Sequence, residues 1–192
     1  MKSEKEKTLK NRQRIVNTAT KLIMEKGAKE TSLSDIAREV GISKGTLYYY
    51  YPTKSELIFD ITNRHMRQIT TDMLSWLENI QEKVSPDRLL TAVYTTLSKA
   101  EKRGKLHLYL IQEAFTDSPN LLSRMRHQYT EWKELLKRGL EKIVPDNPQK
   151  AILAELILAS LDGIIIQSIL GIKAIPIDKM TKYLLEKPVF PA

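Results

Sequence analysis

The stretch Thr31–Lys54, TSLSDIAREVGISKGTLYYYYPTK, decides how the rest of the chain is organised. Ser32 precedes Asp35 by three residues, which is the spacing of a capping box at the start of a helix. The apolar residues that follow recur at the spacing of one buried helix face: Leu33, Ile36, Ala37 and Val40. We therefore expect this stretch to open with a helix of about eight residues.

A glycine turn separates this helix from a second one. Gly41 occupies the place of a left-handed helix cap, and the hydroxyl of Ser43 can accept a backbone hydrogen bond at the start of the next helix. The second helix is expected over Lys44–Tyr51 and must stop at Pro52. Two short helices joined in this way are typical of the helix-turn-helix, whose second helix enters the DNA major groove.

The first turn of the second helix suits contact with DNA. Lys44 supplies a cation, Gly45 allows a close approach of the backbone, and Thr46 carries a hydroxyl and a methyl group that fit a base edge. The turn therefore combines the groups that bind phosphates with groups that distinguish bases.

Four consecutive tyrosines complete the second helix. Tyr51 follows Leu47 by four residues, so these two side chains are expected on the inner face. Tyr48 and Tyr49 then point outward, with hydroxyls available to phosphate oxygens. Burying all four rings would leave hydroxyls unpaired at a cost of about 1–3 kcal/mol each, so a mixture of core and surface roles is expected.

The same residues resemble the DNA-binding signature of the TetR family of bacterial transcriptional regulators. The resemblance is carried by Ile36, Ala37, Gly41–Tyr51, Lys54 and Leu57 within the segment Arg14–Asp60. The chain departs from the family pattern at Tyr51, where phenylalanine is usual, and at Ala28, where an aromatic residue is frequent. The resemblance implies an all-α homodimer that acts as a regulator, most often a repressor, and whose second domain commonly binds a small effector.

Charge and composition agree with a nucleic-acid partner. The net charge is +8, and residues 1–54 hold 12 Lys and Arg against 6 Asp and Glu, whereas residues 55–192 hold 19 against 17. The excess therefore lies in the segment expected to bind phosphates, although lysine-rich bacterial surfaces are also common. Cysteine is absent, and residues 1–10 alternate lysine and glutamate without an apolar core, so we expect a solvated tail, no signal peptide and a cytoplasmic protein.

Helical patterns fill the rest of the chain. A stripe in Asn11–Lys26 completes a three-helix head, and a capping box at Thr53 and Glu56 starts a long helix that runs to about Glu82. Further stripes predict three helices: one around Leu89–Leu97 that closes near Gly104, one over Leu106–Phe115 that closes at Asp117–Asn120, and one over Leu122–Ile143. We expect a DNA-binding domain in residues 1–54 and an effector-binding and dimerisation domain in residues 55–192.

The segment Ala151–Ile172 is the most apolar part of the chain. Its length suits a membrane span, but Glu155 and Asp162 would each cost several kcal/mol in a bilayer, so a helix buried in protein is expected instead. One face can serve its own domain (Leu153, Ile157, Leu161, Ile164) and the other a second copy (Ile152, Leu156, Ala159, Gly163, Ile166, Leu170). With residues 177–187, the segment resembles the two-helix dimerisation arm of the TetR family.

No catalytic motif, phosphate loop, metal cluster or cofactor fingerprint is found, so we expect neither an enzyme nor a bound cofactor or metal. An effector pocket would be lined by aromatic and amide side chains of the second domain, each of which could also be ordinary core: Tyr94, His107, Tyr109, Gln112, Phe115, Tyr129 and Trp132.

The sequence thus predicts a ligand-responsive homodimeric repressor of a palindromic operator. The predicted DNA contacts fall into bases (Lys44, Gly45, Thr46, Tyr48) and phosphates or sugars (Ser32, Ser43, Tyr49, Lys54). Two alternatives remain: a sequence-neutral DNA-coating protein, whose binding would ignore operator mutations, and a helical enzyme that processes small molecules, which turnover assays would detect.

Overall fold

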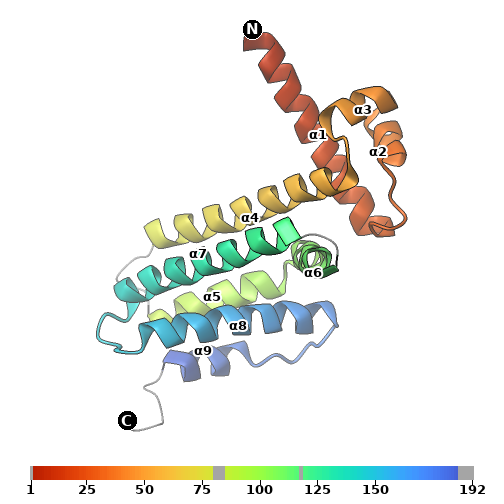
Figure 1. The fold of residues 1–192 in the computed structure, drawn as a ribbon. Helices are drawn as coiled ribbons and strands as arrows, with labels where there is room; N and C mark the ends of the chain where they lie inside the picture. The colour runs from red at the N-terminus through yellow and green to blue at the C-terminus, as the bar shows by residue number, and fades with distance from the viewer. Residues whose placement is uncertain (1, 80–84, 117–118, 186–192) are drawn as a thin grey trace. The chain divides into compact units, whose positions relative to one another are not determined.

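The computed structural model describes residues 2–79, 85–116 and 119–185, and in these residues it contains α-helices and no strand. The predicted all-α fold is confirmed. In chain order the helices are α1 (Lys2–Lys26), α2 (Leu33–Val40), α3 (Lys44–Tyr50), α4 (Lys54–Glu78), α5 (Pro86–Ser98), α6 (Glu101–Thr116), α7 (Pro119–Ile143), α8 (Lys150–Ile169) and α9 (Ile177–Leu185) (Figure 1). The chain divides into two compact units, residues 1–66 and 67–192, so the division falls within α4. The expected domain boundary, between residues 54 and 55, lies at the start of this helix and stays a prediction.

The first unit is a small helical domain around one apolar core. Helix α1 packs against α2, and α2 packs against α3. The core takes buried side chains from each helix: Ile15, Ala19 and Ile23 of α1, Ile36 of α2, Leu47 of α3, and Leu57 and Ile61 of α4. The guanidinium of Arg14 donates a hydrogen bond of 2.8 Å to the carbonyl oxygen of Val40, which joins α1 to the end of α2.

The predicted caps of the helix-turn-helix are confirmed. The Ser32 hydroxyl accepts from the backbone N–H of Asp35 at 3.1 Å, and the Asp35 carboxylate accepts from the backbone N–H of Ser32 at 3.2 Å. Gly41 ends α2 with φ +75°, a left-handed conformation that glycine adopts without strain. The Ser43 hydroxyl caps α3 through the N–H of Thr46 at 3.0 Å, and Tyr51 follows the helix as its buried C-cap.

The start of the chain differs from the expectation of a tail. Helix α1 begins at Lys2 and not at Asn11, although Thr8, Leu9 and Lys10 are exposed as a tail would be. Charges such as Glu6 and Lys10 recur four residues apart, and pairs at this spacing stabilise an exposed helix. The alternating charges of residues 1–10 correctly predicted an exposed segment. The prediction that the first helix starts only at Asn11 was wrong.

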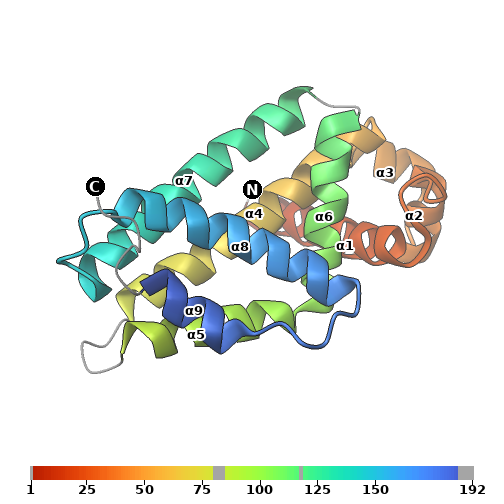
Figure 2. The same cartoon turned by 90° about the horizontal axis from the view of Figure 1, so that it is seen from below.

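The second unit is a bundle in which α8 is the central helix. Helix α8 packs against α7, α6, α5 and α9, and α9 also packs against α5, as Figure 2 shows. The core of the second unit combines side chains from four helices: Leu90 and Tyr94 of α5, Leu136 and Leu140 of α7, Leu153, Ile157 and Ile164 of α8, and, partly buried, Met180 of α9. The expected inner face of α8 is confirmed, because Leu153, Ile157 and Ile164 are buried and Leu161 is partly buried.

One predicted helix end is wrong. Gly104 lies inside α6, and α5 ends at Ser98. A Cβ atom at Gly104 would lie 2.9 Å from the side chain of Ile165 and 3.2 Å from that of Ile169, so glycine is present because α8 passes close to α6 there. The predicted helix end near Glu82, the loop residues Asp117 and Ser118, and the end of the last helix at Lys187 lie outside the described residues.

Helix α8 is, among the described helices, the one long and apolar enough to cross a membrane by length and composition alone, with a mean hydropathy of 1.8. Its packing on four other helices and the ion pair of 2.7 Å between its Glu155 and Lys133 of α7 suit a helix buried in protein. Within a single chain, however, its outer face remains open: Ile152, Leu156, Ala159, Ile166 and Leu170 are exposed.

Candidate functional site

Helix α3 presents the side chains that the sequence predicts for DNA contact. Leu47 is buried and anchors the helix, whereas Lys44 and Gly45 are exposed. Tyr48 is 47% exposed and Tyr49 is 80% exposed. The predicted division of the tyrosines is therefore confirmed: Tyr48 and Tyr49 lie outward, and their hydroxyls are available to an external partner.

The predicted phosphate contacts other than Tyr49 already hold backbone groups. Ser32 and Ser43 are helix caps, and the Ser43 hydroxyl also lies 2.8 Å from the hydroxyl of Thr46. The Lys54 ammonium donates to the carbonyl oxygen of Ala28 in the loop between α1 and α2. All three residues lie in the first unit, and their contacts with DNA stay predictions.

A polar cluster beneath α3 joins three segments of the first unit. The Tyr51 hydroxyl donates to the Asp60 carboxylate of α4 at 2.7 Å and accepts from Arg12 Nε of α1 at 3.3 Å. Arg12 and Asp60 also form an ion pair of 3.0 Å, and the guanidinium lies 5.3 Å from the centre of the Tyr51 ring. Burial, reinforced by the Asp60 carboxylate, raises the pKa of Tyr51 to about 12, so the hydroxyl keeps its proton.

Tyr50, which precedes Tyr51, contacts side chains of α1 and α3. The Asn11 amide donates to the Tyr50 hydroxyl at 3.3 Å, and the rings of Tyr49 and Tyr50 meet edge to face with centres 5.4 Å apart. Asn11, Arg12 and Asp60 were not predicted as site residues. The unusual tyrosine at position 51 was the one signal in the sequence that a hydrogen-bonding partner lay nearby.

The second unit contains a buried polar chain that runs across three helices. His107 Nε2 of α6 lies 2.9 Å from the hydroxyl of Tyr129 on α7. That hydroxyl donates to the Asp162 carboxylate of α8, with oxygen separations of 3.1 and 3.2 Å. Because the hydroxyl has one proton and gives it to Asp162, its oxygen accepts from His107 Nε2.

Trp132 of α7 completes this cluster with an aromatic wall. Its ring centre lies 6.0 Å from that of His107 and 5.2 Å from that of Tyr129. The indole N–H donates to the Thr70 hydroxyl of α4 at 3.0 Å, and the buried Gln128 amide donates to the same hydroxyl at 3.0 Å. Two donors on one hydroxyl fix the tryptophan, so the wall has a defined position.

Burial changes the protonation of the cluster. It raises the pKa of the Asp162 carboxyl to about 6, against the lowering effect of the hydrogen bond from Tyr129. Burial lowers the pKa of the His107 imidazole to about 4, and the Arg103 guanidinium acts in the same direction. It also raises the pKa of Tyr129, together with the Asp162 charge. At neutral pH the cluster therefore contains an ionised carboxylate and a neutral histidine.

The remaining predicted effector residues lie elsewhere. Tyr94 is buried in the core, where its hydroxyl lies 2.5 Å from that of Ser160. Tyr109 is half-buried beside Glu113, and burial and that carboxylate raise the pKa of its hydroxyl. Gln112 and Phe115 are exposed on α6. The structure thus brings together His107, Tyr129 and Trp132, and adds Asp162, which was not predicted as a site residue.

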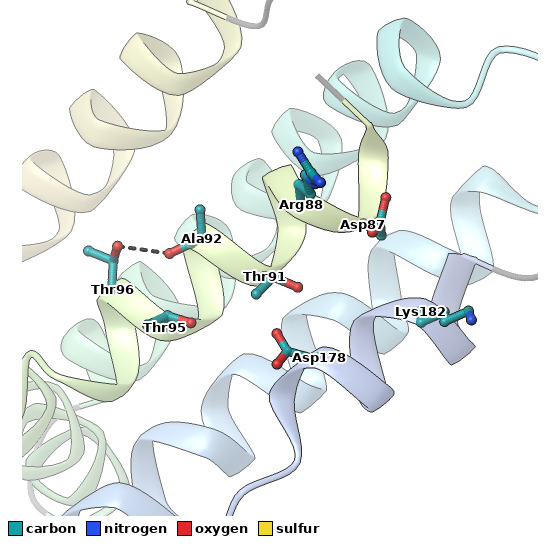
Figure 3. A pocket seen from close by; sticks show the side chains of 8 residues that line it. All are labelled: Asp87, Arg88, Thr91, Ala92, Thr95, Thr96, Asp178 and Lys182. Atoms are coloured by element: carbon teal, nitrogen blue, oxygen red, sulfur yellow. Dashed lines mark hydrogen bonds between the residues drawn. The ribbon is translucent and has the colours of Figure 1, made fainter. Parts of the chain in front are cut away.

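A separate hollow lies on the surface between α5 and α9 and encloses about 600 Å³ (Figure 3). Its lining is polar and rich in threonine, with Asp87, Arg88, Thr91, Ala92, Thr95 and Thr96 from α5 and Asp178 and Lys182 from α9. None of the predicted effector residues lines it. No group of three or more histidines and acidic residues that could hold a metal ion occurs in the part of the chain that the structure describes.

Comparisons with known proteins agree with this geometry. Residues 15–61 match the family model described as bacterial regulatory proteins, tetR family. The chain is 37% identical over 114 residues to the HTH-type transcriptional regulator SAR2658 of Staphylococcus aureus (strain MRSA252), which covers 55% of this chain and 60% of that one. A second Staphylococcus aureus regulator, SAUSA300_2515, is 41% identical over 87 residues, or 42% of this chain and 46% of its own length.

Solved structures share the fold over nearly the whole chain. The reduced form of Escherichia coli NemR has a TM-score of 0.77 at 18% identity and covers 95% of this chain and 99% of its own. A regulator from Saccharomonospora viridis in complex with choline has a TM-score of 0.73 at 23% identity and covers 90% and 92%. The helix-turn-helix built by α2 and α3 lies within the matched segment, so residues 15–61 form a domain of the tetR family of bacterial regulatory proteins.

Proposed function

We propose that this chain is a homodimeric repressor that binds a two-fold-related DNA operator and releases it when a small effector binds. The observation that carries the proposal is the exposed surface of α3, on which Lys44, Gly45, Tyr48 and Tyr49 surround the buried anchor Leu47. A helix fixed in this way can place cationic, hydroxyl and backbone groups in a major groove. The curated relatives, described as transcriptional regulators, support this proposal. The match covers 60% of the length of SAR2658 and 46% of the length of SAUSA300_2515.

The dimer is supported by the open face of α8. An apolar face on a single subunit favours association, because a second copy would remove it from water. We infer that this face, continued by Tyr183 of α9, packs against the same face of the partner subunit. Two copies of α3 would then contact half-sites about 34 Å apart, in the cytoplasm where the operator lies.

The response to an effector is supported by the cluster of His107, Tyr129, Trp132 and Asp162. It lies inside the second unit and combines polar and aromatic groups, as ligand sites commonly do. An effector can shift the protein only by its preference for one of two states, so we expect it to bind more tightly to the form that does not bind DNA.

Binding to a random double-stranded DNA library tests the proposal. Selection should enrich a palindromic sequence, and fluorescence anisotropy should then show that Thr46→Ala reduces the preference for this sequence by about tenfold. Tyr49→Ala should weaken binding to all duplexes, and Tyr49→Phe should separate the role of the hydroxyl from that of the ring. Thr96→Ala, an exposed threonine of α5, is the matched control. Enrichment of no sequence, with binding lost at moderate salt, would support a DNA-coating protein instead.

A further inference from the structure

The cluster on α6, α7 and α8 contains a carboxylate without a cationic partner. Among the described residues, the groups that reach the Asp162 carboxylate are the Tyr129 hydroxyl, at 3.1 and 3.2 Å, and the His107 ring, at 3.8 Å. No lysine or arginine of the described chain lies within ion-pair distance of it. By contrast, Glu155 on the same helix pairs with Lys133 at 2.7 Å.

The ionised, buried carboxylate of Asp162 lowers the stability of the folded chain. Burial disfavours its ionised form, which is why the pKa of Asp162 rises to about 6 although Tyr129 donates to it. The adjacent histidine does not offset the charge, because its own pKa is lowered to about 4 and it is neutral at pH 7. A cation brought from outside would therefore gain the attraction of a charge that the protein leaves uncompensated.

The groups next to the carboxylate are aromatic. The rings of Tyr129 and Trp132 lie 5.2 Å apart, and His107 stacks on Tyr129 at 6.0 Å with 22° between the planes. Aromatic faces attract organic cations, and Trp and Tyr are the most effective residues for this purpose. One third of the Asp162 side-chain surface is exposed and Tyr129 is partly exposed, so a ligand can reach both, whereas Trp132 is buried and supports the Tyr129 ring from the core.

We propose that Asp162, Tyr129 and Trp132 form the binding site of an organic cation, such as an alkyl or quaternary ammonium compound, and that this cation is the effector. The role of the cation as effector rests on the proposed function, whereas the binding site itself requires no DNA. The cation takes the place of the Tyr129 hydroxyl on the carboxylate and packs against the Tyr129 ring, which Trp132 contacts from the core. Because Tyr129 also holds His107, the displacement loosens the contact between α6 and α7.

Calorimetry on the complete chain with two matched probes tests the site. The probes are an alkyl alcohol that carries a trimethylammonium group and the same alcohol with an uncharged tert-butyl group. We expect the cation to bind about tenfold or more tightly than its neutral isostere, because only the cation interacts with the Asp162 charge. A second measurement uses Trp76→Phe, which leaves Trp132 as the single tryptophan, so that quenching of its emission reports binding at the cluster.

Substitutions assign the effect to the carboxylate. Asp162→Asn should weaken the cation by about tenfold or more and leave the neutral probe unchanged. Glu155→Gln removes a carboxylate from the same helix without touching the cluster and should alter neither probe. Equal affinity for both probes, full affinity in Asp162→Asn, or binding of neither probe at millimolar concentration would each overturn the proposal.

Operator binding keeps this test separate from that of the proposed function. Without a probe, Glu155→Gln should bind the selected operator as the unmodified chain does, and the cation should release DNA from both of these but not from Asp162→Asn. If no operator is selected but the cation binds, the regulatory function fails and the site stands. If the operator is bound but the cation is not, the site fails and the DNA-binding function stands.

Discussion

Gly45 is a glycine that the protein fold does not require. Its φ is not positive, and a Cβ atom there would meet nothing closer than the Ser43 hydroxyl at 3.9 Å. Alanine favours a helix over glycine by about 1 kcal/mol, so the fold alone would favour alanine. A glycine on the exposed first turn of α3 is better explained by a partner whose surface approaches the backbone.

Gly45→Ala should therefore separate folding from DNA binding. We expect its free energy of unfolding to equal or exceed that of the unmodified chain by up to about 1 kcal/mol, as measured in urea, whereas operator affinity falls. Gly41→Ala is the opposite control, because φ at Gly41 is +75° and alanine there should lower the free energy of unfolding by about 1 kcal/mol. Unchanged operator affinity in Gly45→Ala would contradict a close backbone approach.

Tyr51 is a buried residue with one polar atom, and Tyr51→Phe removes that atom alone. The hydroxyl bonds to Asp60 and Arg12, which remain paired with each other at 3.0 Å in its absence. We expect the free energy of unfolding to fall by about 1 kcal/mol, the usual contribution of one hydrogen bond. Tyr48→Phe removes an exposed hydroxyl and should not change stability in the same urea titration; a similar loss in both variants would show that the hydroxyl of Tyr51 has no special role.

At the scale of helices, His107 on α6 and Asp162 on α8 should contribute opposite pH dependences. The folded pKa of Asp162, about 6, lies above its ordinary value, so its contribution to stability is complete at low pH and is lost as pH rises towards 6. The folded pKa of His107, about 4, lies below its ordinary value, so its contribution is present above pH 6.5 and is lost as pH falls towards 4. Tyr129 and Arg103 are the other titratable or charged groups that act on the pair.

Single substitutions should show separately how Asp162 and His107 change the free energy of unfolding with pH. Asp162→Asn should become more stable as pH rises from about 4.5 to 6.5, because only the histidine term remains, and His107→Gln should become less stable over the same range. Urea titrations at the two ends of the range measure both, with Glu155→Gln as a control that keeps the shallow dependence of the unmodified chain. Two parallel slopes would show that the residues do not titrate as described.

The helix-turn-helix and the Asp162 cluster differ in how far the sequence could predict them. The caps at Ser32, Gly41 and Ser43 were predictable because each depends on residues no more than four positions away. Asp162 was not, because its partners Tyr129 and His107 lie 33 and 55 positions earlier on other helices, and only packing brings them together. Gly104 misled for the same reason: its function is to admit side chains of α8.

For the whole molecule, the open face of α8 predicts the oligomeric state. Light scattering should give twice the chain mass of 22.1 kDa, and Leu156→Lys should give the mass of one chain, because a lysine buried without a partner costs several kcal/mol. Phe115→Lys is the matched control, since Phe115 is 74% exposed and belongs to α6 rather than to this face of α8. A single-chain mass for the unmodified protein would rule out the proposed dimer and, with it, recognition of a palindromic operator.

The open face of α8 also affects the protein before it is assembled. In the proposed dimer this face is covered only on assembly, so a newly synthesised subunit would display Ile152, Leu156, Ile166 and Leu170 to water until then. During that interval chaperones, proteases and aggregation compete for the same surface, and the interval lengthens as expression falls. Assembly depends on the square of the subunit concentration, so the amount of active regulator should fall faster than the amount of its messenger RNA.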